Sequence, residues 1–414
     1  MASKYKAPRG TFDVLPEQSR ARARVQRAAA EIFARAGYEM VSTPIFEDTE
    51  LFERGVGAST DIVRKEMFTF EDKGERSLTL RPEGTAPVCR AYLEHGMHKL
   101  AQPVKLAYFG PFFRHERPQA GRYRQFHQLG VECIGTDSPL ADAEAIMLLS
   151  DLLGELGVPG VELRLGSLGS FESRQTYLEE LKAHLHKHEG ELSKDVRERI
   201  DVNPLRAFDS DDEGTQGVMA SAPTIVESLE DEDAEHFAEV RGLLDAAGIS
   251  YVVDTTLVRG LDYYTRTIFS FVCDQLGAQS EIGGGGRYDG LIEQLGGPAT
   301  PAVGWAAGIE RILLALDEED EPSGRDAFVA IADPGQRQRA MALVIELRHA
   351  GLSAEVDLAG RGLKGQLKHA NRIGARRVLI LEADGSAQLR DMGSGEQRAV
   401  DPGNLVDEMT GGES

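Results

Sequence analysis

Hydrophobic residues between positions 16 and 36 recur every three or four residues, as in the run from Val25 to Ile32. This period predicts an amphipathic helix that ends at Gly37 and carries arginines on its wet face. The stretch that follows alternates like a strand until Pro44, which cannot donate a hydrogen bond to a sheet. We therefore expect a helix followed by a strand that ends or bends at this proline.

Further along the chain, apolar runs and alternating patterns predict a sheet with helices between its strands. Residues 78–80 and 251–274 have the pattern of strands, whereas residues 140–156 and a segment beginning near Thr85 have that of helices. Residues 171–250 show long helical patterns with little strand signal. They are interpreted as a helical insertion into the sheet-containing part of the chain.

The C-terminal part follows an acidic, turn-rich stretch at residues 317–324, which predicts a linker. Strand and helix patterns then alternate, as is typical of a small α/β domain. Four segments are therefore predicted: a core at 1–170, the helical insertion at 171–250, the rest of the core at 251–318 and the C-terminal domain at 326–414.

The composition is that of an ordinary soluble protein, with 41% hydrophobic and 28% charged residues among 414. No apolar run reaches the roughly 18 residues of a membrane helix, and no secretory signal is visible. Cys89, Cys133 and Cys273 are far apart, and no carboxylate or cysteine completes a metal set with His184 and His188. We expect a cytoplasmic protein with no membrane contact and no metal bound by its own side chains.

The chain is acidic, since 46 basic and 68 acidic residues give a net charge of −22. Such a charge repels nucleic acid at long range, so any RNA contact must come from a local basic face. Residues 361–377 contain six basic residues and no acidic one, and Lys364, Lys368 and Arg372 fall four apart on one helix face. This face is either solvated or a phosphate contact.

The stretch 108–135 concentrates polar chemistry. Four arginines fall within eleven residues, so two extended segments are predicted to flank an anion-binding loop. On the return strand Phe126, Gln128 and Glu132 share one face, and Glu116 shares a face with the first arginine. A solvated basic hairpin is the alternative. The four arginines are Arg114, Arg117, Arg122 and Arg124.

Three other segments carry candidate chemistry. Glu83 and Thr85 lie at a strand-to-helix junction, where they could cap the helix or bind an ammonium group. Residues 259–266 pack arginines, tyrosines and an aspartate between two apolar strands, which could also be a decorated hairpin turn. A glycine run at 283–286 permits close backbone approach to a ligand but is neither a P-loop nor a dinucleotide fingerprint.

Several of these stretches resemble motifs of one enzyme family. The order Phe-Arg-x-Glu, a loop, then Arg-x-x-x-Phe resembles motif 2 of the class II aminoacyl-tRNA synthetases, and RHERPQAGRYRQFHQLGVE is similar to the histidyl-tRNA synthetase form. RGLDYYTRT, residues 259–267, closely resembles a signature confined to that family. The segment around Pro44 resembles motif 1, and GWAAGIERILLAL resembles motif 3, as a glycine-led turn into a helix with Arg311 in about its second turn. The glycine run has one glycine more than the usual family form. Glu382 stands where members tend to have glycine, in the least similar third.

The resemblance implies a fold and a reaction. The fold is an α/β (α+β) class II synthetase core built on an antiparallel sheet, with a helical insertion and a C-terminal α/β anticodon-binding domain. The reaction joins L-histidine to ATP, giving histidyl-adenylate and pyrophosphate, and then transfers histidine to the 3′ end of tRNA(His). ATP with Mg²⁺ on its phosphates, tRNA(His) and a second copy of the chain in a homodimer are the implied partners.

The resemblance also implies roles for individual residues. For histidine binding they are Glu83, Gly84, Thr85, Gln128, Glu132, Arg259, Tyr263 and Tyr264. For ATP they are Arg114, Glu116, Arg122, Phe126 and Arg311. Catalysis is assigned to Arg259, Arg114 and Arg311, and tRNA binding to Arg117, Arg124, Lys364, Lys368 and Arg372.

Two other functions are weighed. A non-catalytic paralogue, similar to the regulatory subunit of ATP phosphoribosyltransferase, would share the fold without aminoacylation, but this chain keeps Arg114, Arg259 and Arg311 and has a C-terminal domain. A plain RNA-binding protein would not need the histidine signature. Histidine-dependent pyrophosphate exchange would separate the synthetase from both.

Overall fold

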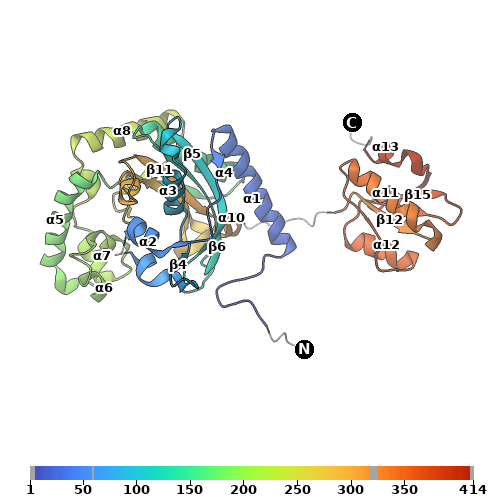
Figure 1. The fold of residues 1–414 in the computed structure, drawn as a ribbon, viewed down its shortest axis with the longest axis horizontal. Coiled ribbons are helices and arrows are strands. Elements are labelled where there is room, and N and C mark those ends of the chain that lie inside the picture. The colour runs from blue at the N-terminus through green and yellow to red at the C-terminus, as the bar shows by residue number, and fades with distance from the viewer. Residues whose placement is uncertain (1–4, 58–59, 317–323, 411–414) are drawn as a thin grey trace. The chain divides into compact units, whose positions relative to one another are not determined.

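The computed structural model describes residues 5–57, 60–316 and 324–410. The chain forms two compact units, Met1–Glu318 and Glu319–Ser414, each with its own apolar core (Figure 1). All but the last residue of the predicted linker at 317–324 lies outside the described residues. The limits predicted for the helical insertion remain a prediction.

The larger unit is built on an eight-stranded sheet in the order β1-β5-β6-β11-β10-β9-β7-β8. Neighbouring strands are antiparallel except for the edge pairs β1–β5 and β7–β8. The predicted antiparallel core is therefore confirmed. The strands are β1 (Glu39–Met40), β5 (Val104–Phe113), β6 (Gln125–Ile134), β7 (Val161–Ser167), β8 (Val252–Val253), β9 (Thr265–Cys273), β10 (Glu281–Arg287) and β11 (Ala302–Gly308).

One face of this sheet is covered by helices that pack through apolar side chains. Their main cluster joins Ile32 and Leu149 to Val131 and Trp305 on the strands. Because side chains alternate along a strand, even-numbered positions of β6 point to the opposite face, which forms the cavity described below. The helices that contribute to the cluster are α1 (Pro16–Arg35), α4 (Pro139–Glu155), α8 (Asp231–Ala246) and α10 (Ile309–Leu316).

A second, three-stranded sheet precedes the long β5–β6 hairpin. It has the order β2-β4-β3, and Pro44 lies between β1 and the first of its strands. The strand expected to end or bend at this proline ends at Met40, and a new strand begins at Phe46, since proline interrupts the ladder. Helix α3 (Thr85–Glu94) starts a few residues after β4, as predicted. The strands are β2 (Phe46–Asp48), β3 (Phe68–Glu71) and β4 (Ser77–Leu80), and α2 (Thr49–Phe52) follows β2.

Helices dominate the chain between β7 and β8. They follow one another with short 3₁₀ turns between them, in keeping with the helical patterns of the sequence. The first three contribute to a second apolar cluster, while α8 packs in the main core. These helices are α5 (Phe171–Lys187), α6 (Lys194–Arg197), α7 (Glu213–Met219) and α8.

The glycine-rich segments form strands, which corrects the turn expected before α10. Residues 302–308 are strand β11, and α10 begins at Ile309, so Arg311 lies in its first turn rather than its second. The glycine run is strand β10, where a Cβ on Gly283 would come 2.6 Å from that of Ala307. Glycine is needed here partly because the neighbouring strands pack so closely.

The smaller unit is a five-stranded sheet in the order β13-β12-β14-β15-β16. The three parallel strands and two helices match the predicted α/β pattern, whereas β15, β16 and α13 were not predicted. Nowhere in the described part of the chain is a helix long and apolar enough to cross a membrane. The elements are β12 (Ala327–Ile331), α11 (Arg337–His349), β13 (Ala354–Val356), α12 (Leu363–Arg372), β14 (Arg377–Leu381), β15 (Ala387–Asp391), β16 (Gln397–Val400) and α13 (Leu405–Thr410).

Candidate active site

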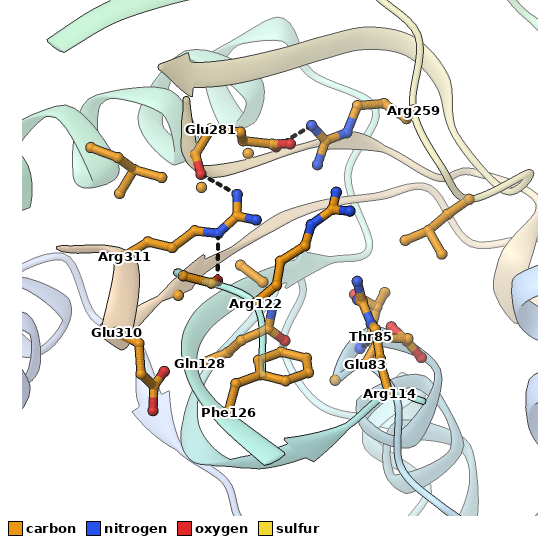
Figure 2. A pocket seen from close by; sticks show the side chains of 18 of the residues that line it. Glu83, Thr85, Arg114, Arg122, Phe126, Gln128, Arg259, Glu281, Glu310 and Arg311 are labelled. Atoms are coloured by element: carbon orange, nitrogen blue, oxygen red, sulfur yellow. Dashed lines mark hydrogen bonds and ion pairs between the residues drawn. The ribbon is translucent and has the colours of Figure 1, made fainter. Parts of the chain in front are cut away.

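A cavity of about 400 Å³ opens on the sheet face opposite the main helices (Figure 2). Its walls come from the start of α3, the β5–β6 hairpin, the segment before β9, strand β10 and the start of α10. Segments far apart in sequence thus meet in one space. The cavity is lined by most of the predicted site residues, namely Glu83, Gly84, Thr85, Arg114, Glu116, Arg122, Phe126, Gln128, Arg259, Tyr263, Tyr264 and Arg311.

The start of α3 forms one end of the cavity. Glu83 caps the helix, because its carboxylate accepts hydrogen bonds from the backbone N–H groups of Thr85 (2.7 Å) and Ala86 (3.0 Å). Burial raises the pKa of Glu83 even though these N–H groups act in the opposite direction. Position 84 has room only for glycine, since a Cβ there would lie 2.5 Å from the ring of Tyr108. The cap and the cavity wall are therefore the same residues.

Glu132 differs from the expectation, because it lies beneath the cavity wall rather than on it. The side chain is fully buried and accepts hydrogen bonds from Thr85 Oγ1 (2.8 Å), the Tyr288 hydroxyl (2.6 Å) and the Tyr108 hydroxyl (3.4 Å). Burial raises its pKa to about 8, although the hydroxyl groups of Tyr288 and Thr85 counteract the shift. Thr85 and Tyr108 both line the cavity, so Glu132 reaches it through them.

Gln128 and the tyrosines complete this end of the cavity. The Gln128 Oε1 atom is buried and accepts no hydrogen bond from the residues that the structure describes. Tyr263 and Tyr264 are nearly buried, with ring centroids 4.7 Å apart. These groups add one unsatisfied acceptor and two hydroxyls to a wall that also carries Glu83 and Thr85.

The β5–β6 hairpin contributes two arginines that one carboxylate holds together. Arg114 donates from Nε to the Pro82 carbonyl at 2.9 Å, and its guanidinium lies 5.4 Å from the centre of the Phe126 ring. The Glu116 carboxylate is 3.8 Å from Arg114 Nη1 and 3.3 Å from Arg122 Nε. Glu116, one of the residues expected to bind ATP, is therefore paired with arginines in this structure.

Two further arginines approach from the other side. Arg311 donates from Nε to the Gly121 carbonyl at 3.2 Å, which connects α10 to the tip of the hairpin. Arg259 pairs with the Glu281 carboxylate (Figure 2). Burial lowers the pKa of Arg311, but guanidinium groups stay protonated at physiological pH. Four cationic side chains thus surround a space of nucleotide size, which suits a polyanion.

Sequence reasoning missed several residues of the site. Tyr108, Tyr123, Glu281 and Glu310 line the cavity, and Tyr288 supports Glu132 from below. Their immediate neighbours in the sequence belong to recognisable motifs, but no spacing pattern singled them out. The β5–β6 hairpin places Tyr108 and Tyr123. The pairing of β10 with β11, and of β11 with β6, brings Glu281, Tyr288 and Glu310 to the site.

The residues predicted to bind tRNA lie in three different settings. Arg117 is exposed on the hairpin loop, whereas Arg124 is half-buried and donates from its backbone N–H to the Gly10 carbonyl at 2.7 Å. The other three lie on α12 of the smaller unit, where Gln366 and Ala370 face the core. Lys364, Lys368 and Arg372 form the exposed basic face of that helix.

Comparison with known proteins identifies the family. The family model for histidyl-tRNA synthetase matches residues 10–312, and a model for an anticodon-binding domain matches residues 326–411. The chain belongs to the histidyl-tRNA synthetase family. Proteins named histidine–tRNA ligase from Rubrobacter xylanophilus and Halothermothrix orenii are each 48% identical over 412 residues, covering 96% and 98% of this chain and 97% and 98% of the relatives.

Solved structures agree with this family. Apo histidyl-tRNA synthetase from S. aureus superposes with a TM-score of 0.83 at 36% identity, covering 98% of this chain and 99% of that one. A Bacillus halodurans protein described as an ATP phosphoribosyltransferase regulatory subunit/histidyl-tRNA synthetase gives a TM-score of 0.68 at 24% identity, over 92% of this chain and 99% of that one. The second likeness shows the fold alone. The regulatory alternative is therefore not favoured.

Proposed function

We propose that histidine and ATP react in this cavity during the histidine–tRNA ligase reaction, which is the activity of the family to which the chain belongs. The observation that carries the proposal is the meeting of four arginines from separate segments with the histidine-signature tyrosines in one cavity. A histidine-dependent exchange of pyrophosphate into ATP by the full chain tests it. Exchange that does not depend on histidine, or no exchange, would contradict the proposal.

Positioning and charge neutralisation account for the chemistry. The histidine carboxylate attacks the α-phosphorus of ATP, and pyrophosphate leaves in line. Arg114 is assigned to the α-phosphate, Arg122 and Arg311 to the outer phosphates, and Arg259 to the space between carboxylate and α-phosphate. Fixed guanidinium groups suit this task, because they stabilise developing charge without reorganising. Phe126 and Glu116 are assigned to the adenine.

The other end of the cavity is assigned to histidine. The carboxylate of Glu83 and the hydroxyl of Thr85 would receive the α-ammonium group beside Gly84. The Oε1 atom of Gln128, which has no partner among the described residues, could accept a hydrogen bond from an N–H group of histidine. For the imidazole we propose Tyr263, Tyr264 and the Glu132 network, since one N–H and one lone pair require both an acceptor and a donor.

Magnesium is proposed as part of the ATP substrate rather than as a resident ion. Among residues 5–57, 60–316 and 324–410, no three His, Cys, Asp or Glu side chains are grouped so that they could hold a metal. The cavity carboxylates Glu116 and Glu281 both pair with arginines. Mg²⁺ would therefore arrive on the phosphates, where it supplies further charge neutralisation.

The tRNA is proposed to bind through local basic groups, because the chain as a whole is acidic. In the larger unit these are Arg117 and Arg124. In the smaller unit they are the exposed residues of α12. Since translation is cytoplasmic, we place the reaction there.

Deleting residues 326–414 is expected to spare adenylate formation and to lower kcat/KM for aminoacylation strongly. The cavity residues all precede position 312, and the larger unit has its own core, so it should fold without the smaller one. Pyrophosphate exchange and aminoacylation would be measured on both chains. An equal loss in the two assays would show that the activities cannot be separated in this way.

A homodimer is proposed from motif 1 and from exposed apolar groups beside it. Four apolar side chains here are between 43% and 53% exposed. They are Met40 on β1, Phe46 on β2, Phe70 on β3, and Ile45 between β1 and β2. Phe46 and Phe70 lie side by side with ring centroids 6.2 Å apart, and adjoining exposed apolar groups often mark an interface. Light scattering should give twice the chain mass of 45.1 kDa. A monomer at working concentration would refute the proposal.

A further inference from the structure

Glu281, the first residue of β10, lies in the cavity and has no counterpart among the residues assigned above. Its carboxylate pairs with Arg259 Nη1, and its backbone carbonyl accepts from Arg311 Nη1 (Figure 2). One residue therefore contacts two of the arginines proposed to act on ATP. No other carboxylate within the described ranges pairs with Arg259.

Arg259 needs such a partner, because the backbone around it is neither helix nor strand. Its guanidinium lies 5.7 Å from the centre of the Tyr264 ring, and its buried Nε atom makes no hydrogen bond to any residue that the structure describes. A free arginine side chain loses considerable rotamer entropy when it becomes fixed. The contact with Glu281 removes much of that freedom before substrates arrive.

Glu281 is suited to hold Arg259 because its own backbone is fixed. It pairs with Val272 of β9, within the central sheet. Burial would raise the pKa of Glu281, but the charge and hydrogen bond of Arg259 outweigh this and leave the pKa below its ordinary value. The carboxylate is therefore ionised at neutral pH, and Arg259 keeps its remaining donors for a substrate anion.

We propose that Glu281 is a positioning residue that fixes the Arg259 guanidinium, through its carboxylate, for the encounter of the histidine carboxylate with the α-phosphate of ATP. The inference rests on the proposed function of Arg259. Because a small misplacement of a catalytic group can cost up to about 10²-fold in rate, loss of this contact should be visible in the chemical step. The carboxylate could instead compete with substrate for Arg259, and its removal would then speed the reaction.

The test measures histidyl-adenylate formation in a single turnover of the full chain, at saturating ATP and histidine. Glu281→Ala should slow this step by about 10-fold or more, and Glu281→Gln, which can still accept a hydrogen bond, by less. The ATP concentration for half-maximal rate should change by no more than about 2-fold, because the backbone contact to Arg311 remains. Glu162→Ala is a matched control, since Glu162 pairs with Arg164 at 3.0 Å on β7 outside the cavity.

A double-mutant cycle separates positioning from a general structural effect. If Glu281 acts through Arg259, the double variant Arg259→Ala/Glu281→Ala should be no slower than Arg259→Ala alone. Additive losses, or an unchanged or faster reaction in Glu281→Ala, would overturn the inference. If Arg259→Ala itself left adenylate formation intact, the proposed function of Arg259 would fail first, and the inference with it.

Discussion

Arg259→Ala is expected to slow histidyl-adenylate formation by about 10²-fold or more, which is the scale of losing one preorganised charge contact. Adenylation brings a carboxylate against a negatively charged phosphate, and both anions must share one small volume. Arg114 can serve the phosphate, so the encounter needs a second fixed cation. Arg259 lines the same cavity and is only 15% exposed.

The reaction step that Arg259 affects can be measured directly. Single-turnover formation of the adenylate should fall strongly, whereas transfer from preformed histidyl-adenylate should fall less, because the two anions have by then been joined. Arg259→Lys should recover only part of the loss, since an ammonium group is a point charge without the planar fork of donors. Intact activation with impaired transfer would assign Arg259 to tRNA handling instead.

Glu132→Gln is expected to raise the KM for histidine by about 10-fold or more and to change the KM for ATP by less than about 2-fold. The carboxyl group organises the hydroxyls of Thr85, Tyr108 and Tyr288 directly behind the wall proposed for histidine. An amide presents two N–H donors where the carboxyl group has at most one O–H, so those hydroxyls must reorient. Sites that satisfy polar groups only with the right ligand can discriminate by about 10⁴-fold or more.

Measurement of both Michaelis constants in the exchange assay checks this expectation. Tyr264→Phe is the companion variant, because it removes the other group proposed to recognise the imidazole while leaving the ring contact with Tyr263. Equal changes in both KM values would contradict the assignment of Glu132 to histidine specificity.

The same variant should also change how stability depends on pH. The pKa of Glu132 is raised from 4.5 to about 8, so between these values the folded chain holds a proton that the unfolded chain has lost. The contribution of Glu132 to the free energy of unfolding is therefore greatest at low pH and falls as pH rises towards 8. The free energy of unfolding in urea should fall less between pH 5 and pH 8 for Glu132→Gln than for the unchanged chain. An identical fall would mean that Glu132 is ionised throughout.

The sequence by itself determined the local elements and most of the candidate residues. The period of the hydrophobic residues and the residues that end helices predicted α1, α3 and α4. Amphipathic helices and their ends are specified within a few turns of sequence. The β5–β6 hairpin could be predicted for the same reason, since its strands are close in sequence. Motif resemblance then supplied twelve side chains or backbone positions that line the cavity.

Only the tertiary structure decided which distant residues meet. From the sequence the glycine run predicted only a close backbone approach, and it forms a strand because it pairs on both sides, with β9 and β11. That pairing brings Glu281 to Arg259 and Arg311, and it places Tyr288 under Glu132. No local period reports such contacts, because they depend on strand order and on the space between strands. The same holds for Glu132. The alternation of side chains along the strand predicted which face of the sheet it occupies, but only tertiary packing decided that Thr85 and Tyr108 would cover it.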